Sequence, residues 1–214
     1  HLTDQVDFAA LAADPPIKLF ISATRVGSGT VRVFREGELT ADMVLASACL
    51  PYLFQAVEIG GEAYWDGGYV GNPALFPLFY EDDLPDDLLI CWINPLEQAE
   101  VPRDSGAILD RLNEISFNAS LLAELRSIAF VQSLLADEVI ASRLAGRYRS
   151  IHVHAVEADT ALAGLPVASK FDTSTAFLTG LKDQGRARFQ AFAAAHRADV
   201  GVRSSVDIRA RYLK

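Results

Sequence analysis

The stretch that decides the fold lies at positions 64–73 and reads Tyr-Trp-Asp-Gly-Gly-Tyr-Val-Gly-Asn-Pro. Its apolar start predicts the end of a β-strand, so Asp66 is expected where that strand gives way to a loop. Gly67 and Gly68 permit a positive φ and a close backbone approach, and Asn72 with Pro73 restricts the far end of the loop. A carboxylate presented in this way can orient or deprotonate a neighbouring hydroxyl group. An Asp-Gly pair is also a common turn, and that interpretation stays open.

Strand-like and helix-like patterns alternate on both sides of this loop. Upstream, apolar or alternating runs predict strands at 18–24 and 31–34, and Thr40 is expected to cap a helix that ends by Pro51. Gly60-Gly61 predicts a tight turn between strands at 57–59 and 63–65. Downstream, 88–93 and 150–156 predict further strands. Continuous apolar runs suit a parallel sheet with helices on both faces, which predicts an α/β fold.

Two long helical patterns occupy the second half of the chain. Apolar residues recur every three or four positions between Gly106 and Gly146, an interval without glycine or proline. One helix over this interval would be about 60 Å long, so we expect two helices or a kink. The run 172–174 is expected to cap a second helix, which Gly185 interrupts or weakens. The apolar positions of the first pattern are Ile108, Leu112, Ile115, Ala119, Leu122 and Leu125.

Composition narrows the class of protein. The 214 residues are 50% hydrophobic, which suffices for a core and excludes wholesale disorder. The formal charge of −9 argues against a general nucleic-acid partner. Cys49 and Cys91 are expected to be reduced thiols. No linker or repeat divides residues 1–214, so we predict a single domain portion without an internal boundary.

The N-terminal residues and the distribution of charge bear on the localisation of the protein. Residues 1–8 have acids where a secretory signal has basic and apolar residues, so we expect an internal stretch of a longer, cytoplasmic protein. Nine acidic residues and one basic residue lie between 81 and 110, whereas seven basic and two acidic residues lie between 186 and 214. The simplest interpretation is two solvated faces. The alternative is that the basic end contacts anionic lipid headgroups or a partner, which would make the protein membrane-peripheral.

The order of motifs around Asp66 resembles the patatin-like phospholipase family. Residues 46–54 read Ala-Ser-Ala-Cys-Leu-Pro-Tyr-Leu-Phe, similar to the family's A-S-x-x-x-P-x-x-F stretch, which precedes a strand ending in Asp-Gly-Gly or Asp-Gly-Ala. The flanking strands agree, so the resemblance covers 17–95, with a weaker echo at 169–186. It implies a three-layer α/β/α sandwich and an acyl lipid substrate. It also implies a Ser–Asp dyad without histidine or cofactor, in which Asp66 is the general base that activates the serine.

The chain departs from this family at the nucleophile. It contains no G-x-S-x-G elbow and no glycine-rich oxyanion segment, both of which precede the aspartate in the family. We therefore expect the C-terminal portion of a single patatin-like domain, incomplete at its N-terminal side and inactive alone. The missing N-terminal segment, on the same or another chain, would bring the serine into a gap that Asp66 faces. The alternative is a non-catalytic patatin-like module that binds lipid or a protein.

Other residues have weaker claims. Four aromatic residues near the loop could line an acyl pocket, although aromatic residues more often belong to a core. Cys49 is expected to be a small helix residue near Asp66. Glu58, Glu62 and Asp66 could pair as glycosidase acids, but their spacing does not establish that geometry. The four aromatic candidates are Tyr52, Phe54, Tyr69 and Phe76.

Metal binding is the remaining possibility. His152 and His154 would share one face of a strand, a spacing found in metal sites. Glu157 is the only further ligand nearby, so we interpret the histidines as an ordinary strand pair and predict no metal. The acidic run 81–87 lacks the calcium-loop pattern and is expected to be a solvated loop.

Overall fold

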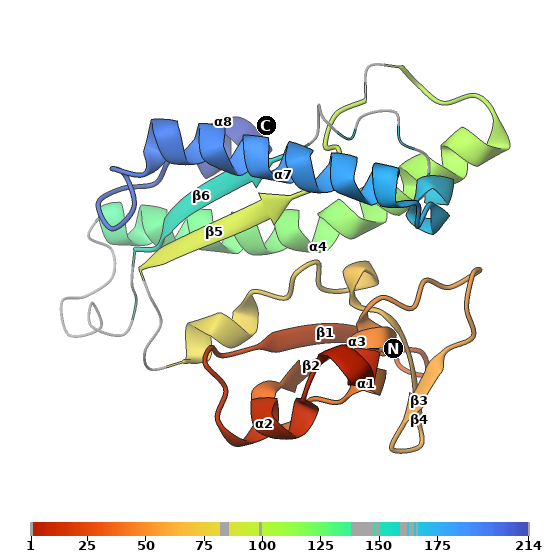
Figure 1. The fold of residues 1–214 in the computed structure, drawn as a ribbon. Helices are drawn as coiled ribbons and strands as arrows, with labels where there is room; N and C mark the ends of the chain where they lie inside the picture. The colour runs from red at the N-terminus through yellow and green to blue at the C-terminus, as the bar shows by residue number, and fades with distance from the viewer. Residues whose placement is uncertain are drawn as a thin grey trace. The chain divides into compact units, whose positions relative to one another are not determined.

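The computed structural model describes residues 2–81, 86–98, 100–137, 148, 150–158, 162, 165 and 167–213. The chain forms two compact units (Figure 1). Unit 1 comprises His1–Asp82 with Ala119–Leu121, and unit 2 comprises Asp83–Asn118 with Leu122–Lys214. Each unit contains both helices and strands, so the predicted mixed α/β class is confirmed.

Unit 1 is built on a four-stranded sheet with the order β2-β1-β4-β3. All of its neighbouring strands are antiparallel, so the expectation of a parallel sheet is wrong here. For β1–β2 and β3–β4 the reason is connection length, because five residues join the first pair and two join the second, whereas parallel neighbours need a crossover of a dozen or more. The strands are β1 (Phe20–Arg25), β2 (Val31–Arg35), β3 (Val57–Ile59) and β4 (Glu62–Asp66).

Short helices accompany this sheet. Thr40 caps α3 (Ala41–Ser47) by accepting a hydrogen bond from the Met43 N–H, as predicted, although the helix ends four residues before Pro51. The Gly-Gly turn is also as predicted, with φ of 61° at Gly60 and 84° at Gly61. The remaining elements are α1 (Leu2–Gln5), α2 (Phe8–Ala13), and the 3-10 helices η1 (Glu36–Glu38), η2 (Gly67–Tyr69) and η3 (Phe76–Tyr80).

The core of unit 1 forms where α3 packs on the sheet. Phe34 and Tyr64 meet edge to face with ring centroids 5.5 Å apart, and burying such a ring stabilises a fold by about 1.5–3 kcal/mol. This packing fixes β1 and β4, the strands that carry the Asp66 site. The buried members are Ala23, Phe34, Leu39, Ala46 and Tyr64.

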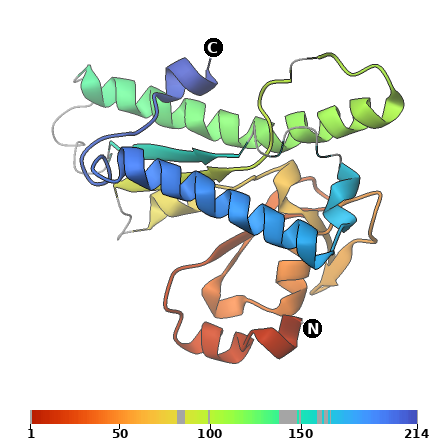
Figure 2. The same cartoon turned by 45° about the horizontal axis from the view of Figure 1, so that its top comes forward.

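Unit 2 contains the parallel strands that the apolar runs predicted. β5 (Asp87–Trp92) pairs in parallel with β6 (His152–Glu157), from Asp87 opposite His152 to Trp92 opposite Glu157. In both cartoon views these strands lie between α4 (Ser105–Ala136) and α7 (Thr175–His196) (Figures 1 and 2). The unit also contains η4 (Val167–Phe171) and α8 (Ile208–Tyr212).

The two long helices test separate predictions. α4 ends at Ala136 and does not reach Gly146, so the predicted interval is not one continuous helix, as expected. α4 continues unbroken for 32 residues, about 48 Å at 1.5 Å per residue, so no interruption falls within it. The rest of the predicted interval, 138–146, lies outside the described residues. By length and composition alone α4 could cross a membrane, a property it shares with core helices of soluble proteins. α7 begins after the Ser174 cap, as predicted, but passes through Gly185 without a break.

Aromatic and charged contacts hold α8 to the strands of unit 2. Trp92 stacks on Tyr212 with centroids 4.6 Å apart. Arg211 and the Tyr212 hydroxyl both donate to the carboxylate of Glu157, at 2.8 Å and 2.6 Å. Burial opposes ionisation of Glu157, but these hydrogen bonds lower its pKa. Glu157 and one cation of the basic C-terminal segment are therefore paired inside unit 2.

Candidate functional site

Asp66 is the last residue of β4, as predicted, and its backbone is held on both sides. Its N–H donates to the carbonyl of Cys49 at 2.8 Å, and its carbonyl accepts the Thr24 hydroxyl at 2.7 Å. Across the ladder it stands opposite Ala23, which is fully buried. The sheet therefore fixes the backbone position of Asp66.

The carboxylate itself is oriented by the loop that follows. Asp66 Oδ1 accepts the Gly68 N–H at 2.8 Å and so caps η2. A charge-assisted bond of this kind is stronger than a neutral one, which limits rotation of the side chain. The carboxyl group is partly buried, whereas Gly67 and Gly68 are buried.

Gly67 is required for a reason other than the one predicted. Neither Gly67 nor Gly68 has a positive φ, because both lie in a 3-10 helix. A Cβ at Gly67 would instead overlap the carbonyl of Ser22 and lie 2.7 Å from its Oγ. The glycine lets the loop pass directly against β1.

Two hydroxyl groups of β1 fasten the loop. The Ser22 hydroxyl donates to the carbonyl of Gly71 at 2.8 Å, and the Thr24 hydroxyl binds the Asp66 carbonyl. Sequence reasoning missed both residues as parts of the site. The available signal was their spacing, since hydroxyl residues two positions apart share one face of a strand.

The far end of the loop is also fixed. The Asn72 N–H donates to the hydroxyl of Ser120 at 3.1 Å, and both residues belong to unit 1. The Asn72–Pro73 peptide bond is cis. Pro73 itself is exposed. The predicted supporting residues Gly67, Asn72 and Pro73 thus lie within one short loop beside Asp66.

We expect Ser22→Ala and Thr24→Val each to lower the free energy of unfolding by about 1–3 kcal/mol, because each leaves a carbonyl without its donor. Denaturant unfolding of the two variants measures this. Ser28→Ala is a suitable control, since Ser28 is exposed and bonds only the nearby Thr30 hydroxyl. Equal unfolding midpoints for Ser22→Ala, Thr24→Val and the control would show that the fastening is unimportant.

The electrostatics of the site keep its neighbours neutral. Burial raises the pKa of the Cys49 thiol, and the charge of Asp66 adds to the rise. Burial and the same charge raise the pKa of the Tyr69 phenol. Cys49 lies near Asp66, as predicted, but follows the end of α3 and donates its thiol hydrogen to the Gln55 carbonyl. It is therefore a poor nucleophile.

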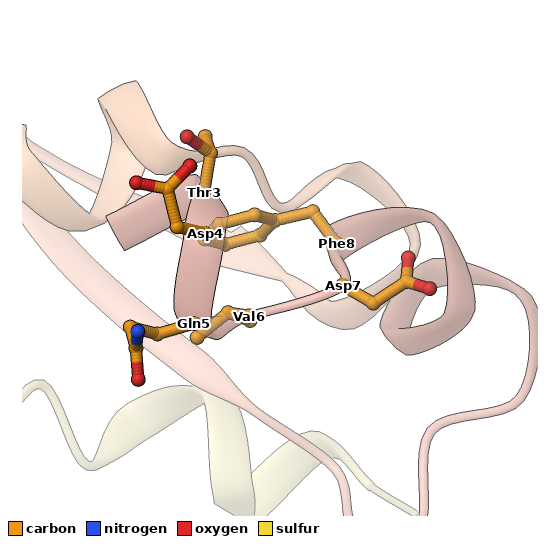
Figure 3. A pocket seen from close by; sticks show the side chains of 6 residues that line it. All are labelled: Thr3, Asp4, Gln5, Val6, Asp7 and Phe8. Carbon is orange, nitrogen blue, oxygen red and sulfur yellow. The ribbon is translucent and has the colours of Figure 1, made fainter. Parts of the chain in front are cut away.

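The aromatic candidates differ in exposure. Tyr52 is 98% exposed and has a φ of 72°, Phe54 is 56% exposed, Phe76 is 41% exposed and Tyr69 is half-buried. Their role in lining an acyl pocket stays a prediction. A hollow of about 560 Å³ lies elsewhere in unit 1, along residues 3–8 (Figure 3). Its lining contains none of the predicted site residues.

The alternative acidic and metal sites receive little support. The carboxylate of Glu62 accepts hydrogen bonds from Tyr64 and Arg25. These contacts hold the pKa of Glu62 below its usual range, which does not favour a role as a general acid. In the described parts of the chain no group of three or more metal-ligating side chains is placed to hold an ion. The solvated-loop interpretation of 81–87 is wrong at both ends. Glu81 binds Lys18 and Arg35, and Asp87 binds His154; residues 82–85 lie outside the described part.

Comparison with known families finds a similarity over part of the chain. Residues 7–79 match the patatin-like phospholipase family. The match contains all four strands of unit 1 and the Asp66 loop, and at the family level it implies lipid acyl hydrolysis. It starts earlier than the predicted resemblance and does not include 80–95 or the echo at 169–186. No curated protein matches the chain.

Proposed function

We propose that this chain carries the general base of a lipid acyl hydrolase of the phospholipase A or esterase type, and that Asp66 is that base. The observation that carries the proposal is the fixed position of Asp66 at the end of β4. Its backbone is bonded to Thr24 and Cys49, and its carboxylate accepts the Gly68 N–H. The match of residues 7–79 to a phospholipase family supports the choice of an acyl lipid as substrate.

In the proposed reaction Asp66 accepts the proton of a serine hydroxyl as the serine oxygen attacks the ester carbonyl. The tetrahedral intermediate then expels the alcohol, which takes the proton from Asp66. Water, deprotonated by the same carboxylate, releases the fatty acid from the acyl-serine. The chain has no G-x-S-x-G motif, so we propose that a segment outside these 214 residues supplies the serine, and that the chain alone does not hydrolyse acyl lipids.

The same segment would complete the proposed three-layer α/β/α sandwich. Among the described residues, β5 and β6 have only each other as ladder partners. Parallel sheets in proteins usually have more strands and are covered on both faces. Additional strands next to β5 would remove an open edge that otherwise favours aggregation.

The proposal is tested by measuring hydrolysis of a short-chain nitrophenyl ester and of phosphatidylcholine vesicles. We expect the complete protein to release fatty acid from the vesicles and residues 1–214 alone to release none. Vesicle binding by the complete protein without release of fatty acid or nitrophenol would contradict the hydrolase and favour the non-catalytic lipid-binding module.

Metal removal provides a separate prediction. Because proton transfer to Asp66 needs no metal ion, we expect EDTA to leave the rate of nitrophenyl ester hydrolysis unchanged. The assay uses a monomeric ester, so that EDTA cannot act through the lipid surface. A rate that falls with EDTA and returns with added Ca²⁺ or Zn²⁺ would contradict the dyad mechanism.

A further inference from the structure

A second arrangement of acid, imidazole and hydroxyl lies in unit 2 and is unrelated to Asp66. His154 Nε2 is 2.8 Å from Asp87 Oδ1, and its Nδ1 is 3.0 Å from the hydroxyl oxygen of Ser205. The three residues come from β5, β6 and the segment before α8. Asp87, His154 and Ser205 therefore form a continuous hydrogen-bonded chain.

The partners decide where the protons lie. Asp87 also accepts the Gly201 N–H at 2.9 Å, and this bond, followed by that to His154, holds the pKa of Asp87 below its usual range. An ionised carboxylate only accepts hydrogen bonds, so Nε2 of His154 must carry a hydrogen. In the neutral imidazole Nδ1 is then the acceptor and Ser205 the donor. This is the polarity that a general base needs to activate a hydroxyl.

The arrangement is rigid at its centre. His154 is 1% exposed and meets the edge of Phe192 with ring centroids 6.1 Å apart. The Ser205 N–H donates to the Val153 carbonyl at 3.2 Å, and the Ser204 hydroxyl accepts the Val153 N–H at 3.0 Å. These bonds hold the hydroxyl of Ser205 against the imidazole. The second histidine, His152, lies with Nδ1 3.5 Å from Asp87 Oδ1, without a hydrogen bond.

Solvent exposure differs between the three hydrogen-bonded residues. Ser205 is only partly buried, whereas the imidazole behind it is closed to solvent. The adjacent turn exposes two apolar side chains, Val200 at 48% and Val202 at 68%. Gly201, between them, has a φ of 77°, which lets the turn bring its N–H to Asp87. Ser205 is thus the more exposed end of the Ser205–His154 pair, and a small apolar surface lies beside it.

We propose that Ser205 is a nucleophile activated by His154 and Asp87, with small neutral acyl esters and related phosphonate esters as its substrates. Ser205 Oγ forms the bond to the acyl carbon while its proton passes to His154 Nδ1, and Asp87 stabilises the imidazolium. The alkoxide leaves and takes that proton from His154. Water then hydrolyses the acyl-serine with the same imidazole as base, which regenerates the hydroxyl.

A fluorophosphonate probe tests this on the complete protein. Attack by Ser205 on phosphorus expels fluoride and leaves a covalent adduct that peptide mass spectrometry locates. We expect an adduct on Ser205 in the wild type, none at this peptide in Ser205→Ala, and full labelling in the control Ser127→Ala, an exposed serine of α4. Absence of a Ser205 adduct in a folded wild-type protein would overturn the proposal and leave the three residues as structural contacts.

Asp87→Asn separates catalysis from structure. We expect Ser205 labelling to slow by about 100-fold, with the near-UV circular dichroism of the wild type retained. If Asp87→Asn unfolds, the comparison of Ser205→Ala with Ser127→Ala still decides, because both variants keep the Asp87–His154 pair. An adduct on Ser205 that forms equally fast in folded Asp87→Asn would contradict activation through His154. Loss of activity in Asp66→Asn concerns the other site and does not affect this result.

Discussion

Asp66→Asn is expected to lower kcat for phosphatidylcholine hydrolysis by the complete protein by about 10²–10⁴-fold, the usual contribution of a general base. The amide cannot accept the serine proton at neutral pH. It can still accept the Gly68 N–H through Oδ1, and Asn caps a helix about as well as Asp. The thermal midpoint should therefore stay near that of the wild type.

The control for this variant is Asp42→Asn. Asp42 is exposed in the first turn of α3, so the substitution makes the same change of charge and shape outside the loop. We expect wild-type kcat in this control. Wild-type kcat in Asp66→Asn as well would exclude Asp66 as the base.

The second large effect concerns stability. Gly67→Ala is expected to lower the free energy of unfolding by about 3 kcal/mol or more, at the upper end of the cost of overpacking. The new methyl group meets the backbone carbonyl of Ser22 as well as its Oγ, and a backbone atom cannot rotate away as a side chain can. Relief would require β1 and the loop to move apart, which would break the bond from the Ser22 hydroxyl to Gly71.

Gly37→Ala is the matched control. An added Cβ there meets no atom within 4 Å, and Gly37 has no positive φ. We expect an unchanged or slightly raised stability, since alanine restricts the unfolded chain. Urea unfolding at one protein concentration compares the two variants with the wild type. Equal midpoints for Gly67→Ala and Gly37→Ala would show that the loop does not press on β1.

Local signals explain the correct parts of the sequence prediction. The Thr40 cap, the Gly-Gly turn and the alternation of 31–34 are each determined by neighbouring residues, and the structure confirms all three. The direction of β1 is a different matter. The apolar run of β1 is compatible with a parallel or an antiparallel neighbour. The short connection to β2 is what makes that pair antiparallel.

Contacts between distant residues explain what the sequence could not predict. The bond from Ser22 to Gly71 spans 49 positions and that from Asp87 to His154 spans 67, so neither leaves a local pattern. Asp87 belongs to a run of acidic residues that predicted a solvated loop, but it is the first residue of strand β5. Gly185 lowers helix propensity, but 22 residues with a Ser174 cap form α7 regardless.

The most direct test of Asp66 as the base is the rate at which the catalytic serine of the complete protein reacts with a fluorophosphonate, with the labelled residue identified by mass spectrometry. The account predicts a labelled serine in a G-x-S-x-G motif outside residues 1–214. Its labelling should slow by about 10²–10⁴-fold in Asp66→Asn and stay unchanged in Asp42→Asn and Asp87→Asn. A G-x-S-x-G serine labelled equally fast in the wild type and Asp66→Asn would contradict it.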